Sequence, residues 1–161
     1  PDLDTQLILV DTYGLVCSPN HPLASLPAPI AWSNLAPHVM VSLQKSSGVR
    51  ANVELHPRVP ARCKQPLYEV GSMSSLHPLL VRGLGYAALP VLAAQPLVSA
   101  GLRYVPLFKP TVRRRLYIVT KRGRSLSPAA AVLLETMTGA VQRLPAIDGL
   151  SIRPVKGDAR A

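Results

Sequence analysis

Two stretches of this chain concentrate small polar side chains that could bind a ligand through hydrogen bonds. Residues 42–47 contain three serines and a glutamine, and residues 71–75 contain three serines ahead of an apolar segment. Backbone N–H groups and hydroxyls at the start of a helix favour a carboxylate or another anion. The simpler alternatives are a polar loop bonded to its own backbone and serines that only cap a helix. A site for a small anion is therefore the chemistry that these residue types suggest.

Residues typical of catalysis and metal binding form no recognisable pattern. The four histidines show no i, i+4 pair, and the two cysteines form no Cys-x-x-Cys pair. No nucleophile elbow or phosphate-binding loop occurs, and Gly83-Leu84-Gly85 lacks the third glycine of a dinucleotide fingerprint. His21 lies among turn-forming residues, where a structural role is the ordinary one. We predict no catalytic residue, no metal and no cofactor, and therefore no enzymatic activity.

The segments around the two loops predict alternating strands and helices, the pattern of an α/β sheet. Strands are predicted at residues 7–10, 13–17, 39–43, 67–70, 86–89, 102–107 and 115–120. Helices are predicted at residues 49–56, from Ser74 or Ser75 to residue 81, at 91–100 and from Ser127 onward. In an open α/β sheet, ligands bind outside the carboxyl ends of the strands. Because each polar loop follows a predicted strand, both should open on the same side.

Glycine, proline and apolar spacing define the remaining elements. Gly83 and Gly85 separate a helix end from a buried strand that stops at Pro90. Residues 57–66 hold three prolines and predict an exposed connection, whereas Trp32 should pack on the core from a short turn. Beyond residue 145 the periodicity is lost, and we predict a disordered tail over residues 145–161. The helix after Ser127 should bury one apolar face, formed by Leu133, Met137, Ala140, Val141 and Leu144.

Composition describes a globular, strongly basic chain. Of its 161 residues, 48% are hydrophobic and 16% charged, and the net charge is +10. A basic cluster between residues 113 and 124 could contact phosphates, but aromatic residues make up only 4% and no helix-turn-helix is legible. A solvated basic surface is the favoured interpretation. No apolar run could cross a bilayer, and no signal peptide is recognisable, so we expect no membrane and a cytoplasmic location with reduced, buried Cys17.

Three blocks of sequence, taken together, resemble one family. They are LVCSPNHPLA at residues 15–24, LVRGLGYAALP at residues 80–90 and RRLYIVTKRGRSLSPAA at residues 114–130. In this order and at about this spacing, they resemble the effector-binding domain of LysR-type transcriptional regulators. The resemblance reaches over residues 1 to about 144, which is nearly the whole chain.

The resemblance implies an α/β, periplasmic-binding-protein-like (type 2) fold of two subdomains, between which the chain crosses twice. It implies that residues 13–112 form a complete second subdomain. Residues 1–12 and 113–144 then form part of the first. The family's domain normally begins with further strands and helices, so we expect a truncation on the N-terminal side.

The resemblance also implies regulation of transcription by a small effector bound in the cleft between the subdomains, and the polar residues at the helix starts predict that this effector is anionic. It implies a homodimer or homotetramer that reaches DNA only through a winged-helix domain absent from this chain. The residues expected to contact the effector are Ser42, Leu43, Gln44, Ser47, Ser72, Met73, Ser74, Gly85 and Tyr86.

Two other classes of protein fit the same pattern. A transport-associated solute-binding protein would have a similar fold, and an export signal in the parent reading frame would favour it. A winged-helix segment in that frame would favour the regulator. An oligomerisation module would bind no ligand at all.

Overall fold

The chain folds into two compact units in a computed structural model that describes residues 2–154. Unit 1 is formed by residues 1–11 and 115–161, and unit 2 by residues 12–114. Two strands, β1 (Leu3–Cys17) and β7 (Arg113–Lys121), contribute residues to both units. Within the described residues, no helix combines the length and apolar character that crossing a membrane requires.

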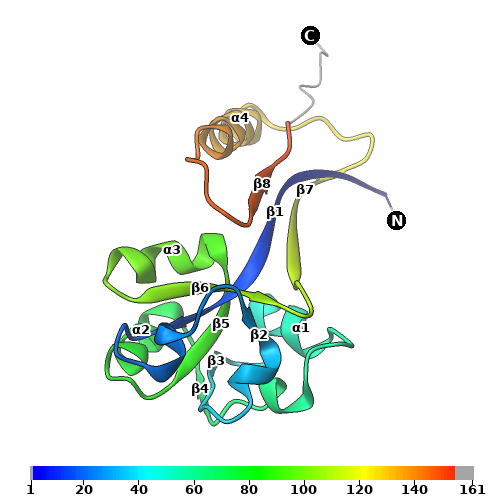
Figure 1. Cartoon of the computed structure of the whole chain (residues 1–161). Helices are drawn as coiled ribbons and strands as arrows, with labels where there is room; N and C mark the ends of the chain where they lie inside the picture. Colours follow the sequence, from blue (N-terminus) through cyan, green and yellow to red (C-terminus); the bar gives the residue numbers. More distant parts are fainter. Residues whose placement is uncertain (1, 155–161) are drawn as a thin grey trace. The chain divides into compact units, whose positions relative to one another are not determined.

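Unit 2 combines part of the main sheet, which has helices on both of its faces (Figure 1), with a separate two-stranded sheet of β3 and β4. The second half of β1 lies between β5 and β6, antiparallel to both, and β2 pairs with β6 in parallel. Its strands are β2 (Ile30–Ala31), β3 (Val41–Leu43), β4 (Tyr68–Val70), β5 (Tyr86–Pro90) and β6 (Arg103–Phe108). Its helices are η1 (Pro22–Ser25), η2 (Trp32–Leu35), α1 (Gly48–Glu54), η3 (Ala61–Lys64), α2 (Met73–Val81) and α3 (Val91–Ser99).

The first strand is longer than the sequence predicted. Two strands, at residues 7–10 and 13–17, were expected to be separated near Asp11 and Thr12. The structure has one continuous strand of 15 residues. Asp11 is fully buried, so this acidic residue does not end the strand as an exposed turn residue would.

A close backbone contact joins β5 to the segment that leads into β3. The N–H of Tyr86 donates to the carbonyl oxygen of Val39 at 3.0 Å, and Met40 pairs with Tyr86 in parallel. A Cβ atom on Gly85 would overlap that same Val39 oxygen. Glycine is therefore required here by the approach of two backbones. The structure confirms the predicted order of elements: a helix end is followed by Gly83, which has a positive φ, and then by a buried strand.

Side chains alternate between two apolar cores along the strands. On β5, Tyr86 and Ala88 face the core that contains Trp32, whereas Ala87 and Leu89 face the second core. Helix α1 and the 3-10 helices cover the first core, and α2 and α3 cover the second. The sheet is thus buried on both faces, which explains why its central strands read as continuous apolar runs.

The connection at residues 57–66 is partly buried, which corrects the prediction that it is exposed. Val59 and Cys63 are almost fully buried, and Cys63 Sγ donates to the carbonyl oxygen of Trp32 at 3.2 Å. Trp32 itself is fully buried, as predicted, and its Nε1 donates to the carbonyl oxygen of Pro110 at 2.9 Å. Trp32 therefore holds two distant loops against the same core.

Both cysteines are buried, unpaired thiols, as predicted for Cys17. Burial raises the pKa of Cys17 to about 11, with a small opposing effect from the charge of Arg103. Burial also raises the pKa of Cys63, and its hydrogen bond with Tyr86 lowers it by less. Neither thiol is ionised near neutral pH, so neither is a ready nucleophile.

We expect both cysteines to resist alkylation in the native chain. At pH 8, iodoacetamide should modify Cys17 and Cys63 at least about a hundredfold more slowly than in 8 M urea, because the thiolate is both scarce and inaccessible. Mass spectrometry of timed samples measures the two rates. Fast native modification of Cys17 would contradict its placement in the core.

Unit 1 contains the first half of β1 and three elements from the end of the chain. These are β7 (Arg113–Lys121), α4 (Pro128–Gln142) and β8 (Leu150–Ile152). Both β7 and β8 pair with β1, and Arg122 Nε bonds to Asp4 at 2.9 Å. The predicted helix start is confirmed, because Ser127 accepts the N–H of Ala130 and Pro128 occupies the first helical position.

Two predictions for unit 1 are wrong. Helix α4 has no buried residue: Leu133 and Met137, expected on a buried face, are 60% and 54% exposed. The predicted disordered tail contains strand β8, in which Ile152 pairs with Leu9. Gln142 Nε2 and Ile8 O also bond to the backbone of Arg153, at 2.9 and 2.8 Å. The part of the predicted tail at residues 155–161 lies outside the described residues.

Candidate functional site

The pairing of β3 with β4 brings the two polar loops together. The strands are parallel, with Ser42 opposite Glu69 and Leu43 opposite Val70. Beyond the strands, the N–H of Gln44 donates to the carbonyl oxygen of Val70 at 3.0 Å. Because the strands run in the same direction, residues 42–47 and 71–75 leave them at the same edge. Helices α1 and α2 both begin at this edge.

Three polar side chains of the first loop keep free hydrogen-bonding capacity. Ser42 is 7% exposed, yet its hydroxyl forms no hydrogen bond with any group of the described chain. Ser47 is the N-cap residue of α1, but its side chain makes no capping bond. The exposed amide of Gln44 likewise has no partner among the described residues. These groups can accept or donate hydrogen bonds to a small molecule.

The second loop carries a cluster of three serine hydroxyls. Ser72 Oγ lies 2.8 Å from Ser74 Oγ and 2.9 Å from Ser75 Oγ, and it accepts the N–H of Ser75 at 3.2 Å. Ser72 is therefore the N-cap of α2, which begins at Met73. This corrects the predicted start at Ser74 or Ser75. Pro78 has no N–H to donate to the Ser74 carbonyl oxygen one turn earlier. It is tolerated inside the helix because Ser74 is exposed.

The remaining predicted site residues have other surroundings. Leu43 and Met73 lie at the same edge, but Leu43 is buried and Met73 packs against the second core. Gly85 and Tyr86 are not brought to the loops. Tyr86 pairs with Met40, at the amino end of β3, and its side chain is 1% exposed in the first core. Burial raises the pKa of Tyr86 further above its ordinary value, so its hydroxyl stays neutral.

A buried arginine, which the sequence analysis missed, fixes the shape of this edge. The side chain of Arg50 on α1 is 4% exposed. Its Nε bonds to Glu54 at 2.7 Å, and its Nη1 bonds to Glu69 at 2.8 Å and to the carbonyl oxygen of Leu43 at 3.2 Å. One guanidinium thus ties α1 to the ends of β3 and β4. The i, i+4 spacing of Arg50 and Glu54 was the available signal.

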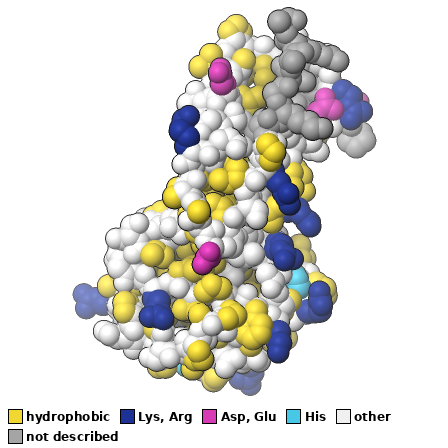
Figure 2. Space-filling model, turned by 45° about the horizontal axis from the view of Figure 1, so that its top comes forward, with side chains coloured by type: hydrophobic (Ala, Val, Ile, Leu, Met, Phe, Trp, Pro, Cys, Tyr) yellow, Lys and Arg dark blue, Asp and Glu magenta, His cyan; other side chains and the backbone are white. Residues whose placement is uncertain are grey.

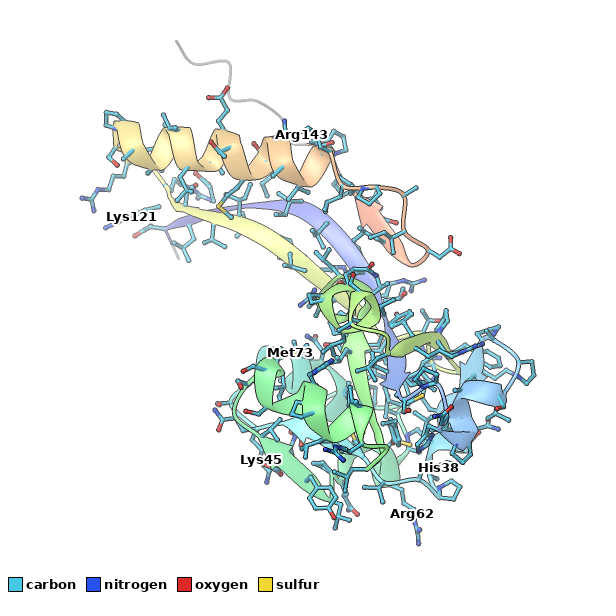
Figure 3. All side chains as sticks on the ribbon, turned by 90° about the vertical axis from the view of Figure 1, so that its left-hand side faces the viewer. His38, Lys45, Arg62, Met73, Lys121 and Arg143 are labelled. Atoms are coloured by element: carbon cyan, nitrogen blue, oxygen red, sulfur yellow. The ribbon has the colours of Figure 1, made fainter. Side chains whose placement is uncertain are left out.

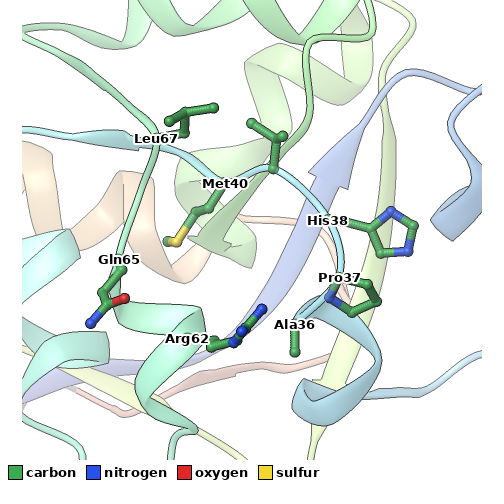
Figure 4. A pocket seen from close by; sticks show the side chains of 8 residues that line it. Ala36, Pro37, His38, Met40, Arg62, Gln65 and Leu67 are labelled. Atoms are coloured by element: carbon green, nitrogen blue, oxygen red, sulfur yellow. The ribbon is translucent and has the colours of Figure 1, made fainter.

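The opposite end of β3 has a separate, shallow depression of about 320 Å³ (Figure 4). His38, Met40, Arg62 and Leu67 are among the residues that line it. Figure 3 places Lys45 and Met73 on one side of unit 2, with His38 and Arg62 on the other. The depression is therefore distinct from the edge formed by the two loops.

His21 and His38 have structural surroundings, whereas His77 Nε2 is a buried atom without a hydrogen-bond partner among the described residues. His21 Nδ1 accepts the N–H of Leu23 at 3.2 Å, and its ring lies 5.3 Å from that of His38. Burial, and then the neighbouring His38, lower the pKa of His21, so it is neutral at pH 7. No group of three or more His, Cys, Asp or Glu side chains that could hold a metal ion occurs in residues 2–154.

Polar loops at the carboxyl ends of parallel strands are the place where α/β proteins of the ligand-binding class hold their ligands. Comparison with known protein families identifies the family of this chain. The sequence model described as LysR substrate binding domain matches residues 1–142. This chain belongs to the LysR substrate-binding domain family.

The curated relatives are transcription regulators of uncharacterised specificity. The chain is 31% identical over 128 residues to the HTH-type transcriptional regulator YbhD of Escherichia coli (strain K12). It is 29% identical over 136 residues to the HTH-type transcriptional regulator YfeR of Shigella flexneri. These alignments cover 80% and 84% of this chain but 40% and 44% of the relatives. The chain therefore spans less than half the length of the curated relatives it matches.

Solved structures show the same fold. The effector-binding domain of QuiR in complex with shikimate aligns with a TM-score of 0.68 and 18% identity, over 89% of this chain and 67% of that chain. The regulatory domain of Synechocystis PCC6803 CcmR in complex with 2-PG aligns with a TM-score of 0.70 and 23% identity, over 90% and 70%. The fold is the periplasmic-binding-protein-like type 2 fold, as the sequence predicted.

Proposed function

We propose that this chain is the effector-sensing part of a LysR-type transcription regulator and has no catalytic activity. A small anionic effector binds at the edge where β3 and β4 end. It is held by Ser42, Gln44 and Ser47 from one loop and by Ser72 and Ser74 from the other. The observation that carries this proposal is the parallel pairing of β3 and β4, which brings the hydroxyl and amide groups of both loops to one edge.

Two further observations support an anionic effector. The hydroxyls face an edge where two helices begin, and helix N-termini favour negative charge. The fold neighbours QuiR and CcmR are described in complex with shikimate and 2-PG. Shikimate carries a carboxylate, which suits a site built from hydroxyls, amides and N–H groups.

In the proposed mechanism, unit 2 is the second regulatory subdomain, and unit 1 is part of the first. The effector shifts the equilibrium between two arrangements of the subdomains by its difference in affinity for them. A homodimer or homotetramer in the cytoplasm transmits this shift to DNA-binding domains. Leu43 and Met73 support the site by packing, whereas Gly85 and Tyr86 contribute to the fold of unit 2 and are not part of the proposed contact surface.

The proposal predicts that serine-to-alanine changes weaken effector binding. A thermal-shift screen of carboxylates and phosphorylated acids identifies a ligand by a raised unfolding midpoint. Ser74→Ala should then weaken its affinity about fivefold, and Ser72→Ala with Ser74→Ala about tenfold or more, because each lost hydrogen bond costs about 1 kcal/mol. Isothermal titration calorimetry measures these affinities.

The matched control is Ser33→Ala with Ser99→Ala, two exposed serines on η2 and α3. Ser74→Ala is the decisive single variant, because it leaves the Ser72 cap of α2 in place. Equal affinities in the Ser74 and control variants would refute the site. If the screen identifies no ligand, the alternative of an interaction module would be favoured. The exposed apolar side chains of α4 support that alternative.

A further inference from the structure

The two acidic residues of unit 2 meet at one side chain. Residues 12–114 contain ten Lys and Arg, but Glu54 and Glu69 are their only acidic residues. On the face that Figure 2 shows, basic side chains are spread over unit 2 and acidic ones are scarce. Both carboxylates nevertheless bond to the guanidinium of Arg50, at 2.7 and 2.8 Å. The acidic groups of a basic unit are thus gathered where α1 meets β3 and β4.

This cluster carries one excess negative charge, because one guanidinium faces two carboxylates. Oε1 of Glu69 bonds to Arg50, whereas Oε2 has no hydrogen-bond partner among the described residues. The side chain of Glu69 is exposed, so a molecule from solvent can reach the second oxygen. Glu69 therefore offers an acceptor with negative charge at the edge where the two polar loops begin.

The buried hydroxyl of Ser42 lies beside this carboxylate. Ser42 and Glu69 are partners in the parallel pairing of β3 and β4. Paired residues of neighbouring strands project to the same face, and the strands are about 4.8 Å apart. Ser42 is 7% exposed, and its hydroxyl has no partner within the described chain. A free hydroxyl and a free carboxylate oxygen therefore stand next to each other.

The loops that follow the two strands supply the opposite charge. Lys45 is an exposed cation of the first loop. Ser72 caps α2, whose N-terminus favours an acid group. Only Val70 and Gly71 separate Glu69 from Ser72 along the chain. The edge thus places an acceptor region with negative charge beside a region suited to an anion.

We propose that the effector carries a protonated amine as well as its acid group, as an amino acid does. Ser42 and the second oxygen of Glu69 accept hydrogen bonds from the ammonium, while the serines of the two loops bind the acid group. The inference rests on the proposed function, since it names a second group of the same effector.

An ammonium suits this pair of acceptors better than the other groups that could approach it. It has three donors and no acceptor, and its charge compensates the excess negative charge of the cluster. A second acid group would be repelled by that charge. A metal ion needs about six oxygen ligands, and no group of three or more suitable side chains occurs in residues 2–154.

The test compares L-amino acids with their 2-hydroxy acids, in which a hydroxyl replaces the ammonium. A thermal-shift screen of this chain with the standard L-amino acids at pH 7 identifies the amino acids that bind. Isothermal titration calorimetry then measures each of them beside its hydroxy acid. We expect the amino acid to bind at least about tenfold more tightly, because hydrogen bonds between charged groups are roughly twice as strong as neutral ones.

Glu69→Gln should reduce this preference for the amine to below about threefold, since the amide keeps an acceptor but loses the charge. The affinity for the hydroxy acid should change less than about twofold, which shows that the site itself persists. Glu54→Gln is the matched control. It removes the other carboxylate of Arg50 with the same change in charge, but Glu54 is the last residue of α1, away from the two loops. It should leave the preference at about tenfold.

Loss of the preference in both variants would reduce it to the net charge around Arg50 and would overturn the assignment to Glu69. Equal affinities of an amino acid and its hydroxy acid, or no binding of any amino acid, would overturn the inference as a whole. An acid without an amine that binds and loses affinity in Ser74→Ala would still support the proposed function. The two failures are therefore distinguishable.

Discussion

Replacing Arg50 with methionine should lower the free energy of unfolding by about 3 kcal/mol, the largest electrostatic effect that we expect in this chain. The change removes the shared partner of Glu54, Glu69 and the Leu43 carbonyl oxygen from a side chain that is 4% exposed. The two carboxylates are 28% and 43% exposed and keep some hydration, which places the effect at the lower end for a broken buried pair. Urea unfolding followed by Trp32 fluorescence measures it.

Arg62→Met is the matched control, because Arg62 is exposed and lies in the same unit. It should change stability by less than about 0.5 kcal/mol. Adding Glu54→Gln and Glu69→Gln to the Arg50 variant should recover part of the loss, since no uncompensated carboxylate remains. A loss below about 1 kcal/mol for Arg50→Met would mean that the ion pairs contribute little.

Gly85→Ala should destabilise unit 2 by about 3 kcal/mol or more. The new methyl group would overlap the carbonyl oxygen of Val39, which is backbone and cannot rotate away as a side chain would. Relief requires β5 to separate from the segment before β3, with loss of the Tyr86 N–H to Val39 bond. Overlap and a broken buried hydrogen bond each cost about 1 to 3 kcal/mol. Thermal and urea unfolding report the change.

Gly71→Ala is the control for this substitution. No atom lies within 4 Å of a Cβ at Gly71, and its φ is negative or extended. The same chemical change should therefore leave stability within about 0.5 kcal/mol, or raise it slightly by restricting the unfolded chain. Similar losses in both variants would show that the backbone contact at Gly85 is not the cause.

Signals that are local in sequence predicted local structure correctly. Ser127 with Pro128 marked the start of α4, and Gly83 with Gly85 marked the turn before β5. Each outcome depends on backbone angles and hydrogen bonds within a few residues. The strand boundaries before the two polar loops could be predicted for the same reason, and with them the shared edge of β3 and β4.

Features that depend on distant partners were missed. Arg50 meets Glu69 only because β4 pairs with β3, so the spacing of Arg50 and Glu54 alone did not indicate a buried guanidinium. Asp11 and Thr12 were predicted to end a strand. Asp11 is instead buried, and this burial depends on its tertiary environment, which the local sequence does not show. Tyr86 was expected to contact the effector, whereas its side chain is buried in the first core.

Helix α4 shows a different limit of periodicity. Its apolar spacing correctly predicted a helix with one apolar face. Such spacing shows that this face can pack against another surface, but not that such a surface is present. Burial requires a second surface, and in the described chain the side chains of Leu133 and Met137 remain more than half exposed. The pattern therefore predicted the element and not its environment.

The short edge strand β4 has a consequence for how tightly an effector can bind. It has three residues, one neighbouring strand and two exposed side chains, so opening it locally costs less free energy than unfolding the whole unit. Half of the proposed site is built on the loop that follows this strand. Part of the binding energy must then be used to keep the edge closed. Tighter sensing can consequently arise from substitutions that anchor β4 and never touch the effector.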